Sequence, residues 1–207
     1  TENGSVDLYY DGVKKIETTS GGANVTGALT VNGAALAGGG FASVQYFTSS
    51  GTWTKPSGIK IIRVTVLGGG GGGGRSNYYY DYGANGGGGG GLSQKIIDVT
   101  SISSETVTIG AGGSGVNSNA TGGSGGTTSF GSHCSASGGS GGSGQISGTS
   151  ASGSTTAGIG SNGNINLRGG YGEIGNRGQS YAIGGTGGAS PLWGVDSPGG
   201  LGGSGGS

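Results

Sequence analysis

The chain has 207 residues, 60 of them glycine, and only 29% of its residues are hydrophobic. This composition excludes the two side-chain-filled cores that a chain of this length can ordinarily build. Lys and Arg equal Asp and Glu at nine each, which leaves no basic surface for nucleic acid, and the single cysteine excludes an intrachain disulfide framework.

The first segment, residues 1–40, is predicted to form short β-strands. Val6, Leu8 and Tyr10 alternate with polar neighbours, and the Asp11-Gly12 pair that follows is a strong hairpin signal. So small a unit needs disulfides, metals or oligomerisation for stability. We therefore expect a fibre shaft shared among identical chains. A homotrimer is the commonest arrangement in fibres, although these residues do not themselves set the number.

Residues 41–110 are predicted to form a small antiparallel β domain that is interrupted by a glycine-rich loop. The strongest strand is 59–67 (IKIIRVTVL), where β-branched residues alternate with polar ones. Two further strands are expected at 93–99 and 105–109, and together they make one face of a sheet. Trp53 is the expected anchor of its core.

Residues 111–207 are predicted to form a glycine-rich tip, because glycine recurs there with a period of three. In 138–144 and 199–207, two glycines alternate with one Ser or Leu. That period matches an extended left-handed helix with three residues per turn. We predict a bundle of polyglycine II-type helices that bond backbone to backbone, with the third residue pointing outward. The all-glycine runs 68–74 and 86–91 suit helices surrounded on every side.

Other interpretations of the glycine runs fit less well. Collagen has one glycine per triplet and much proline, whereas this repeat has two glycines and the chain has only three prolines. A phosphate-binding loop after a strand requires a closing Lys-Ser or Lys-Thr and a helix, and neither follows Gly68–Gly74.

The amino-acid sequences of several segments resemble those of a known protein family. Glu2–Gly33 (ENGSVDLYYDGVKKIETTSGGANVTGALTVNG) resembles the β repeats in tail-fibre proteins of marine tailed bacteriophages. Phe47–Gly74 (FTSSGTWTKPSGIKIIRVTVLGGGGGGG) is similar to the start of the glycine-rich tip domain at the end of many phage tail fibres, and the similarity continues through 86–115 and 125–139. Such tips commonly close with a short apolar strand, whereas this sequence reads Gly205-Gly206-Ser207.

The resemblance implies a trimeric, extracellular virion fibre that recognises a host. Its partners would be a cell-surface receptor, either a polysaccharide or an outer-membrane protein, and other tail-fibre or virion proteins. Neither the residues nor the resemblance implies a cofactor, a metal ion, nucleic acid or enzymatic activity. Because the chain starts at Thr1 and contains no Met, we expect it to be a fragment of a longer protein.

Aromatic and polar insertions between the glycine runs are the candidate receptor-binding residues. The densest insertion holds four tyrosines in five positions, and tyrosine offers a large, rigid contact area with a polar tip. Packing of these tyrosines against the sheet or across a trimer interface is the equally weighted alternative. The candidates are Arg75, Asn77, Tyr78, Tyr79, Tyr80, Tyr82, Tyr171, Arg177, Tyr181 and Trp193.

Three other functions remain as alternatives. A structural extracellular filament without specific receptor binding would carry uniform repeats, whereas this chain has distinct insertions. Ice binding needs a regular outward array of Thr or Ala, and the outward positions here are mixed. A depolymerase needs two facing carboxylates, and no convincing pair is present. His133 and Cys134 are adjacent in the chain, which is a poor arrangement for a catalytic pair.

Overall fold

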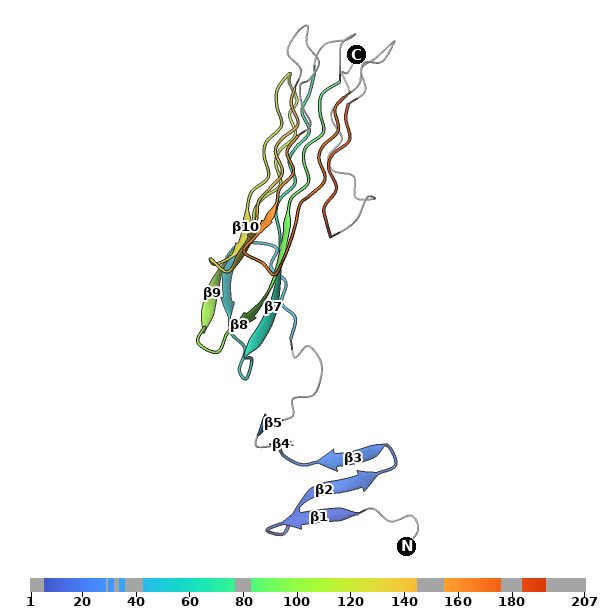
Figure 1. Ribbon diagram of the computed structural model, residues 1–207, viewed down its shortest axis with the longest axis vertical. Coiled ribbons are helices and arrows are strands. Elements are labelled where there is room, and N and C mark those ends of the chain that lie inside the picture. Colours follow the sequence, from blue (N-terminus) through green and yellow to red (C-terminus); the bar gives the residue numbers. More distant parts are fainter. Residues whose placement is uncertain are drawn as a thin grey trace. The chain divides into compact units, whose positions relative to one another are not determined.

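The computed structural model describes residues 6–28, 30–31, 34–35, 43–76, 83–144, 155–175 and 184–192. These residues form antiparallel β-sheets and extended segments, and none of them is helical (Figure 1). The chain divides into two compact units, Thr1–Gln45 and Tyr46–Ser207.

The first unit holds a three-stranded sheet in the order β1-β2-β3. Its strands are β1 (Asp7–Tyr10), β2 (Val13–Thr19) and β3 (Gly22–Val25). Asp11 and Gly12 connect β1 to β2 with φ of 51° and 73°, the left-handed pair that a tight hairpin turn requires. The hairpin expected at this position is therefore confirmed. A second hairpin pairs β4 (Thr30–Val31) with β5 (Ala34–Ala35).

One face of the three-stranded sheet is apolar. Leu8 pairs with Ile16, which pairs with Val25, and Tyr10 pairs with Val13. Directly paired residues share a face, and a bulge between these pairs keeps Val13 on the apolar side. Leu8, Tyr10 and Val13 are nevertheless 55%, 75% and 52% exposed. Among the described residues of the first unit, no second layer covers this face.

The second unit contains two sheets with a small apolar core between them, rather than the single sheet face expected. The sheets run β12-β11-β10-β9-β6 and β13-β8-β7. Trp53 and Phe130 are 6% and 4% exposed and meet edge to face, with ring centroids 5.5 Å apart. Trp53 is therefore a core anchor, as predicted. The strands are β6 (Gly51–Thr54), β7 (Ile61–Leu67), β8 (Leu92–Asp98), β9 (Ser104–Thr108), β10 (Thr128–Phe130), β11 (Cys134–Ala136), β12 (Gly160–Ser161) and β13 (Ile165–Leu167).

The division expected between residues 110 and 111 falls inside this unit. β10 pairs with β9, and β13 pairs with β8, so strands from both sides of that position share each sheet. Pairing between strands that are far apart in the sequence joins residues 46–110 to those after 110. Local composition does not reveal such pairing.

Extended glycine segments continue from these strands and run side by side (Figure 1). Each bonds to its neighbour at every third residue. The N–H groups of Gly68, Gly71 and Gly74 donate to the carbonyls of Gly91, Gly88 and Asn85 at 2.9, 2.8 and 3.1 Å. The segments, named here by their residues, are 68–75, 84–91, 110–114, 120–126, 137–143, 155–159, 169–175 and 184–190.

Segment 84–91 is enclosed by its neighbours. Backbone bonds join it to 68–75, 137–143, 155–159, 169–175 and 184–190. Its glycines are buried, and a Cβ on Gly88 would lie 2.3 Å from the carbonyl oxygen of Thr156. Only glycine permits this approach, which explains the all-glycine sequence of 86–91.

Among the described residues, the run 68–74 has neighbours on fewer sides than the sequence predicts. Gly70 is exposed, and its nearest described neighbour would be 3.9 Å from an added Cβ. The described neighbours of segment 68–75 lie toward its other sides. Third-position side chains such as Ser124, Thr156 and Thr186 do face outward, as expected.

Candidate functional site

The glycine segments form antiparallel pairs whose ends meet at one edge of the bundle. Gly74 bonds to Asn85 and Asn85 bonds to Ser143, with N–O distances of 3.1 and 3.0 Å. The N–H of Gly86 donates to Glu173 at 3.0 Å, and that of Gly185 donates to Ala84 at 2.9 Å. We call this edge, where these residues come together, the loop end. The described residues that flank 77–82, 145–154 and 176–183 in the sequence lie at this edge.

Buried polar groups fix the loop end in place. Ser76 and Asn85 are fully buried. The Asn85 side-chain oxygen accepts from the N–H of Gly175 at 3.3 Å, and the Thr155 hydroxyl donates to the carbonyl of Gly86 at 2.7 Å. Satisfied buried polar groups resist displacement, because breaking them leaves unpaired donors and acceptors. The loop end is thus a rigid frame.

Arg75 is the candidate residue that the structure places at the loop end. It exchanges two backbone bonds with Ala120, at 3.1 and 3.3 Å. Its Nε is buried and has no hydrogen-bond partner among the described residues. The other candidates from the insertions, Asn77, Tyr78, Tyr79, Tyr80, Tyr82, Arg177, Tyr181 and Trp193, lie outside the described residues.

Tyr171 lies elsewhere, on the side of segment 169–175. It is 54% exposed, and the guanidinium carbon of Arg168 lies 5.8 Å from its ring centroid. Ile174, three residues further on, is 44% exposed. Arg168, Tyr171 and Ile174 thus form an outward side row. Ile174 was not among the residues predicted from the sequence, although the three-residue spacing of Arg168, Tyr171 and Ile174 was a usable signal.

An open groove of about 310 Å³ is lined mainly by residues of segments 137–143 and 155–159. Hydroxyls line it, and two of them are already committed: Ser137 donates to Ile159 at 3.4 Å and Ser140 to Thr156 at 3.0 Å. Arg168 reaches its edge and contributes a positive charge. The groove is open rather than enclosed, unlike the concave cleft of most small-molecule sites.

The Cys134 and His133 side chains do not form a reactive pair. Cys134 is 1% exposed, and burial raises the pKa of its thiol, which disfavours the nucleophilic thiolate. His133 instead lies 3.1 Å from the Glu105 carboxylate. Among the described residues, no three His, Cys, Asp or Glu side chains gather closely enough to hold a metal ion. The described part of the chain also contains no helix long and apolar enough to cross a membrane.

Comparison with known families shows that residues 46–207 match a glycine-rich domain. The matched range begins with the second unit and contains strands β6–β13, the glycine segments and the loop end. No curated protein matches the chain.

Proposed function

Since the chain belongs to the glycine-rich domain family over residues 46–207, we propose that it is the receptor-binding end of a bacteriophage tail fibre. In this proposal it is a non-enzymatic, extracellular virion protein. It binds a polysaccharide or an outer-membrane protein on the host surface and joins other virion proteins in the fibre. The resemblance of Glu2–Gly33 and Phe47–Gly74 to phage fibre segments supports the assignment.

The glycine segments act as polyglycine II-type helices in this proposal. Their backbone bonds recur every three residues, as that helix requires. None of the segment glycines described has a positive φ, in keeping with the value of about −75° for this conformation. Backbone bonding between helices takes the place of an apolar core, so the bundle is stiff without large side chains.

The rigid frame at the loop end supports the proposed binding of a receptor. Residues 77–82, with their four tyrosines, are held between Ser76 and Gly83, both of them buried. A rigid frame lowers the entropy that a binding loop loses when it meets a surface. Tyrosine and arginine, which flank or fill the insertions, are common at binding hot spots.

The apolar face of the first unit supports the homotrimer. Leu8, Tyr10 and Val13 stand on one face of a sheet too small to be stable alone. The opposite face is polar and paired: Lys14 Nζ lies 2.9 Å from both Asp7 and Glu17. Identical chains that bury their apolar faces together would supply the missing core.

Cell adsorption tests the function. The full chain, labelled with a fluorophore, is compared with a variant carrying Tyr78, Tyr79, Tyr80 and Tyr82 changed to Ser, on a panel of host cells. We expect the variant to lose at least about tenfold in affinity, the effect of losing one hot spot or more. Tyr46→Ser, at a tyrosine that is 89% exposed outside the insertions, is the matched control and should bind normally.

Two results would count against the proposal. Equal adsorption of the four-tyrosine variant would remove residues 77–82 from recognition. Absence of specific adsorption by the unmodified chain on every host tested would favour a structural filament instead. Enzymatic stripping of surface polysaccharide, compared with deletion of outer-membrane proteins, separates the two classes of receptor.

A further inference from the structure

Segment 68–75 has an open side with unused acceptors. Most of its N–H groups and several carbonyls bond to four neighbouring segments, but the carbonyls of Gly68 and Gly71 have no partner among the described residues. Gly70, which lies between them, is exposed, and only the Gly88 oxygen, at 3.9 Å, comes near an added Cβ. This side of the bundle therefore presents acceptors three residues apart.

Segment 84–91 presents unused donors beside those acceptors. The N–H groups of Gly87 and Gly90 find no acceptor in the described part of the chain. Both glycines are buried, and a buried N–H without a partner is unfavourable because it has lost its bond to water. Added Cβ atoms on Gly87 and Gly90 would lie 2.1 and 2.0 Å from the oxygens of Gly71 and Gly68, so donors and acceptors share one seam.

The seam has the geometry of a vacant position in the bundle. Segment 184–190 borders it, because Gly188 donates at 2.8 Å to the carbonyl of Gly87, whose N–H is the unused donor. Pro191, which lies three residues after Gly188, has no N–H to donate. One extended chain with a three-residue period would fit between 68–75 and 184–190. It would donate to Gly68 and Gly71 and accept from Gly87 and Gly90.

We propose that residues 199–207 of this same chain occupy the seam. These residues lie outside the described ones, and their sequence, GGLGGSGGS, is what supports the proposal. Its three-residue repeat is the same as that of segment 137–143 and fits the spacing of the donors and acceptors in the seam. Nine residues at ~3.1 Å each span about 28 Å, enough to cover the eight residues of 68–75. The chain leaves segment 184–190 beside the seam, and residues 191–198 are long enough to turn it back.

Amide hydrogen exchange tests this proposal. The full chain is compared by NMR with a chain shortened to end at Pro198. We expect the amides of Gly87 and Gly90 to exchange at least about tenfold faster in the shortened chain. Gly88 and Gly89, which donate to Ser140 and Gly170, should stay protected in both and serve as internal controls. Equal rates at Gly87 and Gly90 in the two chains would overturn the proposal.

A second pair of variants keeps the test decisive if shortening loosens the whole bundle. Gly70→Leu places a side chain in the seam, whereas Gly112→Leu places one at another exposed glycine whose added Cβ is also 3.9 Å from its nearest described atom. In the full chain, Gly70→Leu should release Gly87 and Gly90 and Gly112→Leu should not. Unchanged protection in Gly70→Leu contradicts the proposal. If Gly87 and Gly90 stay protected in the shortened chain but lose protection when the protein is diluted, a second copy of the chain occupies the seam. That result would also reject the proposal.

Discussion

Gly88 illustrates how single residues shape this molecule. Its N–H donates to Ser140 at 2.9 Å and its carbonyl accepts from Gly71 at 2.8 Å, while a Cβ would meet the Thr156 oxygen at 2.3 Å. The residue is therefore held by its backbone alone. The sequence predicts this role from the all-glycine run 86–91, because the absence of any side chain signals neighbours on every side.

Substitution of Gly88 should be costly although it removes no contact. We expect Gly88→Ala to lower the free energy of unfolding by about 3 kcal/mol, because the methyl group forces neighbouring backbones apart. Gly112→Ala, at an exposed glycine whose added Cβ would make only an ordinary contact at 3.9 Å, should change it by less than about 0.5 kcal/mol. Chemical denaturation of both variants measures this, and equal stabilities would contradict close backbone packing.

Glu17 should show an acid-sensitive pairing in the first unit. A hydrogen bond from Asn24, and then the Lys14 ammonium, hold the pKa of the Glu17 carboxyl below its ordinary value of 4.5. A lowered folded pKa contributes stability above 4.5 that is lost as the pH falls through the folded value. In Asn24→Ala, the NMR titration midpoint of Glu17 should rise toward 4.5. An unchanged midpoint would exclude the Asn24 bond as the cause.

Among the structural elements, the strands and the glycine segments differ in how well they can be predicted from the sequence. The alternation in 59–67 and the turn residues Asp11-Gly12 are local signals, and β7 and the first hairpin follow them. The pairing of β10 and β13 with strands before residue 110 has no local signal. Trp53 was predictable as an anchor, but its partner Phe130 was not, because 77 residues separate them.

The small core between the two sheets should respond to large-to-small substitution in the usual way. Trp53→Ala should destabilise the second unit by about 3–5 kcal/mol through lost burial and a cavity. Ile61→Ala in β7, where the side chain is 65% exposed, should cost less than about 0.5 kcal/mol. Thermal unfolding of both variants makes the comparison. A small loss at Trp53 would mean that the glycine segments alone hold this unit together.

For the whole molecule, the sequence indicates a bundle and an oligomer but not the arrangement of the binding surface. The three-residue period foretold the outward side chains, yet it did not separate the side row at Tyr171 from the loop end at Arg75. Which segments become neighbours depends on backbone bonds between residues as distant as Gly86 and Glu173. Segments made only of glycine have no side chains that could specify which segments pair.

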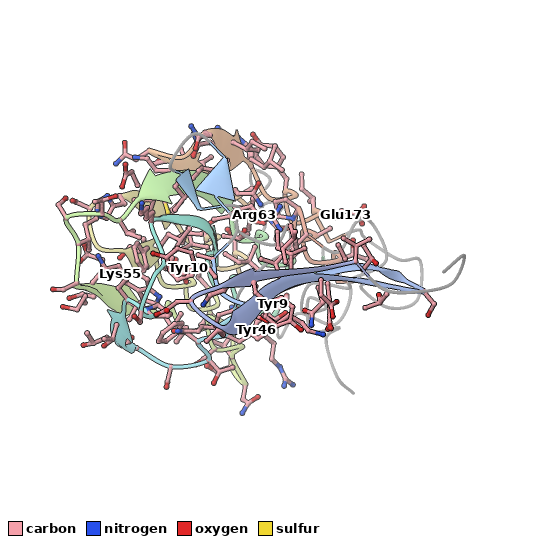
Figure 2. All side chains as sticks on the ribbon, turned by 90° about the horizontal axis from the view of Figure 1, so that it is seen from below. Tyr9, Tyr10, Tyr46, Lys55, Arg63 and Glu173 are labelled. Carbon is pink, nitrogen blue, oxygen red and sulfur yellow. The ribbon has the colours of Figure 1, made fainter. Side chains whose placement is uncertain are left out.

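The proposed trimer predicts different effects for two adjacent tyrosines. Tyr10 belongs to the apolar face of β1 and Tyr9 to the opposite face, and they are 75% and 61% exposed (Figure 2). Tyr10→Lys should dissociate the oligomer, because it puts a charge into the shared core. Tyr9→Lys should leave the oligomer intact. Light scattering coupled to size exclusion reads out the mass, and a monomeric unmodified chain would refute the trimer.

Hydrogen exchange at Gly86, Gly88, Gly89 and Gly91 measures most directly whether main-chain bonding stands in for an apolar interior. Each of these amides donates to a carbonyl of another segment, with N–O distances of 2.9–3.0 Å. They should be among the slowest amides of the second unit to exchange, comparable with those of β7 and β8. Exchange at the rates of an unfolded chain, while the β-strand amides stay protected, would show that the glycine segments do not hold together.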